Sequence, residues 1–324
     1  MRQIAFAKGF KVSGTTLADI LLRIAYFNNW YTDLASESIA MGRLKDVTWG
    51  EIKDFNLVIE DNHWNRTEMK HMLDTDALRI AMLRRPPIQF ESMFNFFDLR
   101  GFYNVTSIKD FIDKLERNEI TNNSRFVKLF GRNPLSWFLG LDESDFDNIT
   151  AINNFIQRTE KMFDLVLISE FFDESLMILR DMTGFPISYF NYIPINLRDE
   201  KKKYYLSKKQ EEILGNWNQA DTLLYKKFKR LLEDRITPRI IQNVKTLQSI
   251  NNRMHNFCQT SLNTTSEYHD LDKRFGTFDW NHIDSNRSHF YCKSLENKRP
   301  SHTQEKNSPL QNSFEVQRLF KRAV

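Results

Sequence analysis

Short apolar runs alternate with segments of helical periodicity from the N-terminus to about Arg198. The apolar runs are rich in residues that suit a sheet, and they predict strands over residues 3–7, 56–60, 78–83, 165–170 and 189–193. The periodic segments predict helices over residues 16–27, 90–97, 108–117, 151–163 and 174–183. Such alternation is typical of an α/β fold whose mostly parallel sheet is covered on both faces and binds ligands at the carboxyl ends of its strands.

The last third of the chain has a different pattern. From about Leu206 to Phe257 the apolar positions recur with helical spacing among many charged residues, which indicates amphipathic helices with a solvated face. After Cys292 the sequence is polar, and we expect disorder with a short helix near residues 314–320. The expected organisation is an α/β core over residues 1–205, a helical part of the same domain over 206–297 and a polar tail over 298–324.

Composition narrows the class of protein. The 324 residues, of which 41% are hydrophobic and 27% are charged, are enough to bury a full core. The formal net charge of +4 is mild for this length, which disfavours a general nucleic-acid binder. No stretch approaches the roughly 18 apolar residues of a membrane span, and no signal peptide precedes the first predicted strand, so we expect the chain as written to be soluble.

The cysteines and the asparagine sequons are weak indicators of the cellular compartment of the protein. The two cysteines, Cys258 and Cys292, are too few for a disulfide scaffold and lack metal-ligand spacing. They either form one disulfide in an oxidising compartment or remain thiols in a reducing one. Six N-x-[ST] sequons occur in this asparagine-rich chain, at Asn65, Asn104, Asn122, Asn148, Asn263 and Asn286.

The loop after the first predicted strand carries the clearest chemical signal. Gly9 and Gly14 let the backbone turn tightly before the first helix, so that loop amides and the helix N-terminus point at an anion. The loop also supplies a cation and two hydroxyls, from Lys11, Thr15 and Thr16. This arrangement predicts a phosphate-binding strand-loop-helix. The alternative is a capped helix after an edge strand, with Ser13 or Thr15 as N-cap.

The spacing of Gly9 and Gly14 resembles a Walker A loop, but Thr15 stands where the Walker lysine would be. An enzyme that handles a γ-phosphate needs that lysine directly after the second glycine, which argues against ordinary ATP or GTP hydrolysis. A 5′-phosphate whose neighbouring group is transferred suits Lys11 better. A P-loop kinase or NTPase stays an alternative, with residues 57–61 as its Walker B strand.

A second anion signal follows the third predicted strand. Arg84 leaves that strand at its carboxyl end, and Ser92 lies about two turns further on, in the next predicted helix. Both side chains can therefore converge on a second phosphate. The alternative is a turn enforced by Pro86 and Pro87 that leaves the arginines solvated.

Several segments resemble a known family. Residues 11–16 are similar to the 5′-phosphosulfate loop of Golgi sulfotransferases, and residues 83–86 with 90–92 are similar to their 3′-phosphate motif. The block over residues 163–176, FDLVLISEFFDESL, resembles the one that marks the galactose 3-O-sulfotransferases. Further matches are residues 195–198, 217–221 and 224–225, so the resemblance extends over roughly residues 2–260.

The resemblance implies a sulfotransferase fold, a P-loop-like three-layer sandwich with a central parallel sheet. It implies transfer of a sulfonate from 3′-phosphoadenosine-5′-phosphosulfate (PAPS) to the 3-hydroxyl of a galactose on a glycolipid or glycan, without a metal. At the matched positions the 5′-phosphosulfate would be held by Lys11, Val12, Ser13, Gly14, Thr15 and Thr16. The 3′-phosphate would be held by Arg84 and Ser92. Lys11 would also neutralise the charge on the bridging oxygen as the sulfonate departs.

Transfer also needs a base for the sugar hydroxyl. The best candidate is His63, which follows the second predicted strand, since imidazole titrates near neutral pH and lies at the ligand-facing end. With Asn62 it matches an Asn-His pair of the family. Glu170, at the end of the fourth predicted strand, is the reserve base, and its alternative role is to orient the next helix. We expect Asp173 to be the N-cap of that helix.

The sequence departs from the family pattern mainly on the acceptor side. Gly9 and Phe10 replace the usual threonine and histidine before the loop lysine, and Arg85 replaces an aspartate. After His63 the pattern is lost, and because a glycan on Asn65 would obstruct the site, we expect Asn65 to be unmodified. These changes leave the acceptor open and keep a catalytically inactive glycan-binding homologue as a further alternative.

The family also implies a location. Its members are luminal Golgi proteins with an N-terminal membrane anchor, so the resemblance implies membrane association through a segment that this sequence lacks. Either the chain is incomplete at its N-terminus or it is a soluble derivative. A luminal location favours a disulfide between Cys258 and Cys292.

Overall fold

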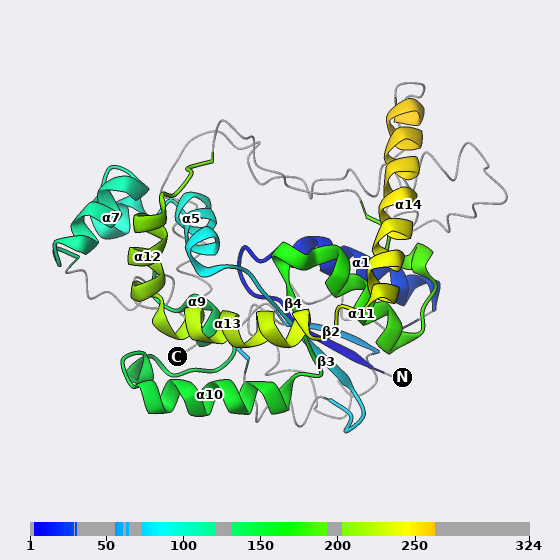
Figure 1. The fold of residues 1–324 in the computed structure, drawn as a ribbon, viewed down its shortest axis with the longest axis horizontal. Helices are drawn as coiled ribbons and strands as arrows, with labels where there is room; N and C mark the ends of the chain where they lie inside the picture. Colours follow the sequence, from blue (N-terminus) through cyan, green and yellow to red (C-terminus); the bar gives the residue numbers. More distant parts are fainter. Residues whose placement is uncertain are drawn as a thin grey trace, which may run out of the picture.

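Four parallel strands form the centre of the fold (Figure 1). In the computed structural model they are β1 (Ile4–Ala7), β2 (Leu57–Glu60), β3 (Leu78–Leu83) and β4 (Leu165–Ile168), arranged in the order β2-β1-β3-β4. Every residue of β1 and β4 is buried, as expected for strands of a parallel sheet that other elements cover on both faces. The predicted α/β class and the four predicted strands are therefore confirmed.

The structure describes residues 3–28, 30, 56–60, 63–64, 73–120, 131–192 and 203–262. Several predictions lie outside these ranges. They concern the polar tail with its short helix, the motif at residues 195–198, Cys292, the Asn62 partner of His63, and the sequons at Asn65, Asn122, Asn263 and Asn286.

The fifth predicted strand, over residues 189–193, is wrong where the structure describes it. Residues Ile187–Phe190 form a short 3₁₀ helix, η4, after Pro186, whose carbonyl accepts a hydrogen bond from the Tyr189 amide at 3.0 Å. The apolar side chains of this segment pack against helices instead of pairing with a strand, and Phe190 is fully buried. A short apolar run after a proline is compatible with a strand or with a helical turn. Here the helical turn forms, because it buries the apolar side chains against neighbouring helices.

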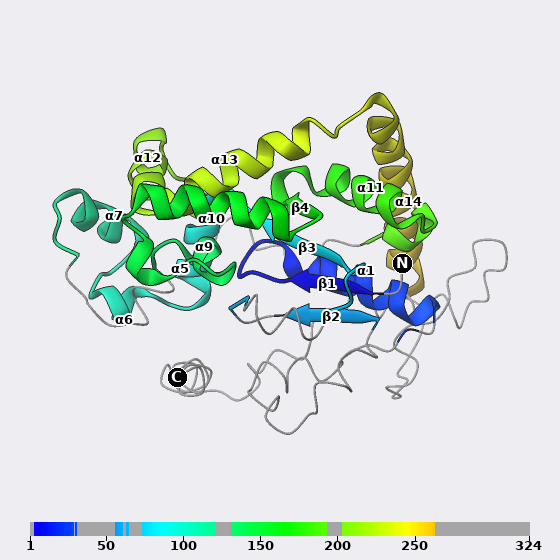
Figure 2. The same ribbon diagram turned by 90° about the horizontal axis from the view of Figure 1, so that it is seen from below.

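Long helices pack around the sheet, as both views show (Figures 1 and 2). Helix α1 lies against β2, and α11 and α13 lie against β4. The helices of this part are α1 (Gly14–Phe27), α10 (Ile149–Met162), α11 (Phe172–Thr183), α13 (Gln219–Glu233) and α14 (Pro238–Leu262). In the described ranges no helix is both long enough and apolar enough to cross a bilayer.

A second, smaller core lies beyond the carboxyl ends of the strands, at the end of the molecule opposite α14 (Figure 1). Its helices are α5 (Pro86–Phe96), α6 (Arg100–Tyr103), α7 (Ile108–Glu116) and α12 (Lys208–Trp217). Phe90, Phe94 and Phe111 pack together at its centre, with Leu214 of α12 in the same cluster. The predicted helices over residues 90–97 and 108–117 are thus confirmed, although α5 begins earlier.

The early start of α5 changes the interpretation of its two prolines. Pro86 and Pro87 occupy the first helical positions, where a missing N–H costs nothing and the fixed φ suits the helix. They therefore begin α5 directly after Arg84 and Arg85, and both are buried. The turn expected in the alternative interpretation is therefore replaced by a helix start, whereas Arg85 is exposed as that alternative expected.

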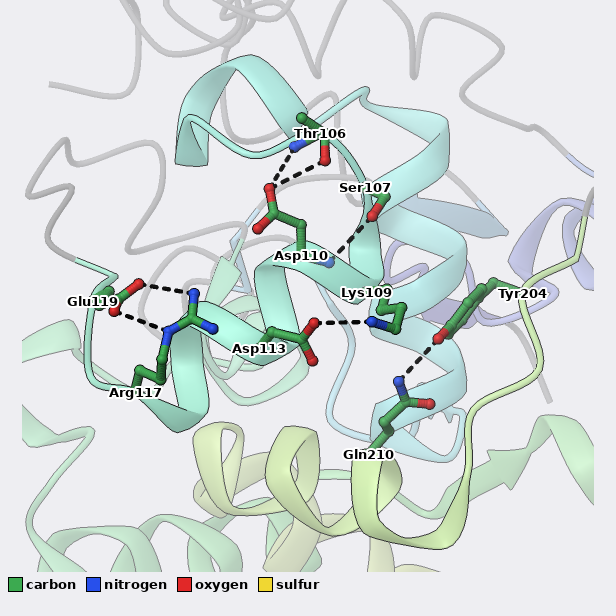
Figure 3. A network of polar contacts seen from close by, with 9 residues as sticks. All are labelled: Thr106, Ser107, Lys109, Asp110, Asp113, Arg117, Glu119, Tyr204 and Gln210. Atoms are coloured by element: carbon green, nitrogen blue, oxygen red, sulfur yellow. Dashed lines mark hydrogen bonds and ion pairs between the residues drawn. The ribbon is translucent and has the colours of Figure 1, made fainter.

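Charged side chains on and next to the exposed face of α7 pair with one another (Figure 3). Lys109 pairs with Asp113 one turn away at 3.1 Å, and Arg117 pairs with Glu119 at 2.9 Å. The Ser107 hydroxyl caps the helix by accepting from the Asp110 amide at 3.1 Å. These short-range pairs are typical of a solvated helix face, and each contributes little to stability.

Candidate active site

The loop between β1 and α1 has a left-handed backbone at two positions, and neither is a glycine. Lys11 has a φ of 59° and Ser13 has a φ of 68°, whereas Val12 between them does not have a positive φ. Alternating left- and right-handed residues turn successive N–H groups towards one point, which makes an anion-binding concavity. The expectation that Gly9 and Gly14 supply the turn is therefore corrected, because neither of them has a positive φ.

Three side chains hold this backbone through its carbonyl oxygens. Gln89 Nε2 donates to the carbonyl of Phe10 at 3.0 Å and Arg84 to that of Lys11 at 3.1 Å, while the Ser169 hydroxyl donates to the carbonyl of Val12. In a trans peptide the C=O and the next N–H point in opposite directions. Because these carbonyls point at Gln89, Arg84 and Ser169, the N–H groups of residues 11–13 point away from those side chains.

Gly14 is required by close packing instead of by its φ. A Cβ at this position would lie 2.8 Å from Cγ of Lys8, so the aliphatic stem of Lys8 passes over the first turn of α1. A Cβ at Gly9 would make only ordinary contacts, for instance with Phe138 at 3.7 Å. Lys8 thereby brings a second lysine to the loop, which the sequence reasoning missed.

The start of α1 bears on the alternative interpretation of the loop. The helix begins at Gly14, so Thr15 lies in its first turn, whereas Ser13 stands in the N-cap position that this alternative gave it, and the Leu17 amide donates to the Ser13 carbonyl at 3.4 Å. Strand β1 lies inside the sheet, between β2 and β3, so it is not an edge strand. Thr15 is half-buried and Thr16 is buried, at the positive end of the helix dipole.

The predicted cations meet at the loop. The ammonium group of Lys11 lies 3.9 Å from the ring centroid of Phe96, whose side chain is 65% exposed at the end of α5. A cation–π contact at such an exposed position is worth about 0.5–1 kcal/mol, so a charged ligand can displace it. Arg84 contacts the Lys11 carbonyl, and Ser92 lies half-buried on α5.

Both carboxylate oxygens of Glu170 are engaged. One accepts from the Arg85 amide at 3.0 Å, and the other accepts from the Tyr225 hydroxyl at 3.1 Å. Burial, followed by the charge of Glu170, raises the pKa of Tyr225, which therefore remains a donor. Glu170 thus ties the ends of β3 and β4 to α13, an arrangement typical of a positioning role. Its role as reserve base stays a prediction.

The prediction that Asp173 caps its helix is wrong. Helix α11 begins at Phe172, and Phe171, in the N-cap position, makes no side-chain capping bond. The Asp173 carboxylate instead accepts from the Tyr192 hydroxyl at 2.7 Å and from Gln248 Nε2 at 2.9 Å. Its bonds therefore reach residues distant in sequence, which a local capping pattern cannot reveal.

His63 lies between β2 and β3, next to a buried anchor. Its neighbour Trp64 is buried against Phe163, and the Trp64 amide donates to the carbonyl of Phe138 at 2.7 Å. The imidazole packs edge-on against Trp137 at 5.0 Å between centroids and is exposed on its other side. Its enclosure lowers the pKa of His63 below the usual 6.5, and the charge of Asp142 opposes this shift.

A buried carboxylate fixes the short helix α9 (Pro134–Phe138), which carries Trp137 and Phe138. Asp221 in the first turn of α13 is fully buried and accepts from the amides of Leu135 at 3.0 Å and Ser136 at 2.7 Å. In return, Asn133 Oδ1 accepts from the Ala220 amide at 3.0 Å. We call Asn133, Asn218 and Asp221 the α9–α13 clamp, because the Asn133 amide also donates to Asn218 Oδ1 at 2.7 Å.

Comparisons with known proteins agree with the resemblance in the sequence. The galactose-3-O-sulfotransferase family model matches residues 1–271. Galactosylceramide sulfotransferase of Homo sapiens is 27% identical over 274 residues, which are 79% of this chain and 64% of that protein. Galactose-3-O-sulfotransferase 2 of Sus scrofa is 25% identical over 277 residues, covering 79% and 68%. The chain thus spans less than two thirds of the human relative's length.

The buried carboxylate of the clamp predicts a pH-dependent stability. Burial raises the pKa of Asp221 from 3.8 to about 6, so between these values the folded protein binds more protons than the unfolded chain. The stability that this group contributes at low pH is therefore lost as the pH rises through about 6. In urea unfolding, the advantage of the wild type over Asp221→Asn should shrink by about 1 kcal/mol between pH 5 and pH 8.

The matched control is Asp110→Asn, at an exposed carboxylate whose pKa hydrogen bonding lowers. Asp110 stays ionised in both states over this pH range, so its variant should keep a constant difference from the wild type. A constant difference for Asp221→Asn as well would contradict the assignment of the raised pKa.

Proposed function

Because the chain belongs to the galactose-3-O-sulfotransferase family, we propose that it transfers a sulfonate from PAPS to the 3-hydroxyl of a terminal galactose. The observation that carries the proposal is the β1–α1 loop, whose strained backbone is tied by three side chains with its N–H groups turned outwards. Such a loop at a helix N-terminus suits a dianionic group.

The residues around the loop fit both ends of the donor. The amides of residues 11–13, the Lys11 ammonium and the first turn of α1 with Thr15 and Thr16 would hold the 5′-phosphosulfate. Arg84 and Ser92 would hold the 3′-phosphate, which distinguishes this donor from ATP. Arg84 lies between the two groups in this proposal, since it donates to the loop carbonyl of Lys11 at 3.1 Å.

In the proposed reaction, the galactose 3-oxygen attacks the sulfur as the bond from sulfur to the 5′-phosphate oxygen breaks. His63 accepts the hydroxyl proton, and 3′-phosphoadenosine-5′-phosphate leaves. Lys11 and the loop amides stabilise the charge that grows on the leaving oxygen. The lowered pKa of His63 suits this role, because it keeps the imidazole neutral and able to accept a proton at neutral pH.

The acceptor is a galactose-terminated glycolipid or glycan in this proposal. The human relative is named for galactosylceramide, whereas the pig relative is named only for galactose. We further propose that the protein acts on the luminal side of the Golgi, at the membrane where such acceptors are made.

The decisive experiment incubates the protein with PAPS labelled in its sulfonate and a panel of terminal galactosides. We expect label on the galactose 3-hydroxyl, identified by linkage analysis, and transfer that continues in EDTA. Phosphoryl transfer from ATP that requires Mg²⁺ would instead favour the kinase alternative, because phosphoryl transfer needs a metal to bridge the phosphates. Galactoside binding without transfer to any acceptor would favour the inactive homologue.

Arg84→Gln should reduce the preference for a 3′-phosphate. The variant loses the charge but keeps an amide that can donate to the Lys11 carbonyl. Calorimetry should show that wild-type protein binds 3′-phosphoadenosine-5′-phosphate more tightly than AMP, and that the ratio falls about tenfold or more in Arg84→Gln. Ser92→Ala, which leaves the loop contacts intact, should lower the same ratio less. An unchanged ratio in both variants would remove Arg84 and Ser92 from the donor site.

His63→Ala should lower kcat about 10²- to 10⁴-fold, while binding of 3′-phosphoadenosine-5′-phosphate stays at the wild-type level. In the wild type, kcat/KM should fall at acid pH as His63 becomes protonated. Asp142→Asn keeps a side-chain acceptor for the Ser144 amide but removes the charge that raises the pKa of His63. In this variant the fall of kcat/KM at acid pH should therefore occur at lower pH than in the wild type. An unshifted pH profile would argue against His63 as the base.

A further inference from the structure

Helix α9 lies between the two halves of the proposed site. On one side its Trp137 ring packs 5.0 Å from the His63 ring. On the other side Phe138 packs 6.2 Å from Phe10, the loop residue whose carbonyl Gln89 holds. The Phe138 carbonyl also accepts from the Trp64 amide, directly after His63. Any displacement of α9 therefore moves His63 relative to the β1–α1 loop.

The helix cannot hold itself in place. It has five residues, and a helix of this length is unstable without tertiary contacts. The α9–α13 clamp supplies those contacts at its N-terminus. Both oxygens of Asp221 accept α9 amides, and Asn133 and Asn218 add bonds in both directions between the two helices.

The clamp uses a buried carboxylate where a neutral side chain would suffice to stabilise the helix end. A carboxylate that is fully buried is expensive, and no cation contacts Asp221 among the hydrogen bonds and ion pairs of the described residues. A neutral Ser or Asn cap would hold a helix end at lower cost. What a carboxylate adds is two acceptors in one rigid plane, which fix two neighbouring N–H groups at once.

We propose that Asp221 is a positioning residue for His63, acting through α9 to set the distance between the base and the donor loop. This inference rests on the proposed function. The donor loop itself is held by Gln89, Arg84 and Ser169, none of which belongs to the clamp. Loss of Asp221 should therefore impair the transfer step and spare donor binding.

The test compares Asp221→Asn and Asn133→Gly with the wild type. Asn offers one oxygen in place of two, so one α9 amide loses its acceptor. Gly at position 133 accepts the observed φ of 48° but removes the side chain that holds α13. For both variants we expect kcat to fall about ten- to a hundredfold with donor KM within about twofold of the wild type.

The His63 titration, followed by NMR, provides a readout that does not depend on activity. When α9 loosens, the imidazole loses its enclosure by Trp137, so its pKa should rise towards 6.5 in both variants. The signal is assigned with His63→Gln. The control is Ser107→Ala, which removes the cap of α7 at a distant solvated helix (Figure 3) and should leave kcat and the titration unchanged.

The outcomes separate the inference from the proposed function. If the wild type transfers no sulfonate, the proposed function fails and the role of His63 as a base fails with it, whereas the His63 titration still decides whether Asp221 holds His63 through α9. If the wild type is active but both folded variants keep its kcat and its His63 pKa, the positioning role is overturned. If Asp221→Asn does not fold, Asn133→Gly decides by the same two measurements.

Discussion

Parallel pairing in the order β2-β1-β3-β4 is the constraint on which the proposed site depends. It sends the carboxyl ends of all four strands to one edge, so that each strand delivers a different group there. The donor loop follows β1, His63 follows β2, Arg84 follows β3 and Ser169 follows β4. Helix α1 then returns over the sheet and brings its N-terminus to the same edge.

The donor loop shows how this convergence is used. A left-handed backbone at Lys11 and Ser13 costs roughly 1–2 kcal/mol per residue and does not persist in an isolated peptide. Here it is held by side chains that follow two other strands, Arg84 after β3 and Ser169 after β4. The anion-binding geometry therefore exists only when the sheet has formed, and folding and preorganisation of the site are a single event.

Sequence reasoning succeeded where the signal is local. Apolar runs and helical periodicity identified the four strands and the main helices, and the expectation that Lys11 and Arg84 lie at the same end of the strands agrees with their hydrogen bond. It failed where partners are distant in sequence. Asp221 lies 85 residues from Ser136, and the Asp173 carboxylate is held by Gln248, 75 residues away. No periodicity reports such pairs, and residues 217–221 stood out only through their family resemblance.

The two halves of the proposed site, the β1–α1 loop and the surroundings of His63, are held in place in different ways. The half proposed to hold the donor is backbone held by side chains of Gln89, Arg84 and Ser169. The half proposed to hold the base follows β2 and packs against α9, a helix of five residues that is held by one buried carboxylate and its asparagine partners. Hydrogen bonds to a buried charge are strong and depend on geometry. If the proposed roles hold, a small change at the clamp would therefore shift His63 without unfolding the β1–α1 loop, and differences between acceptors would arise around His63.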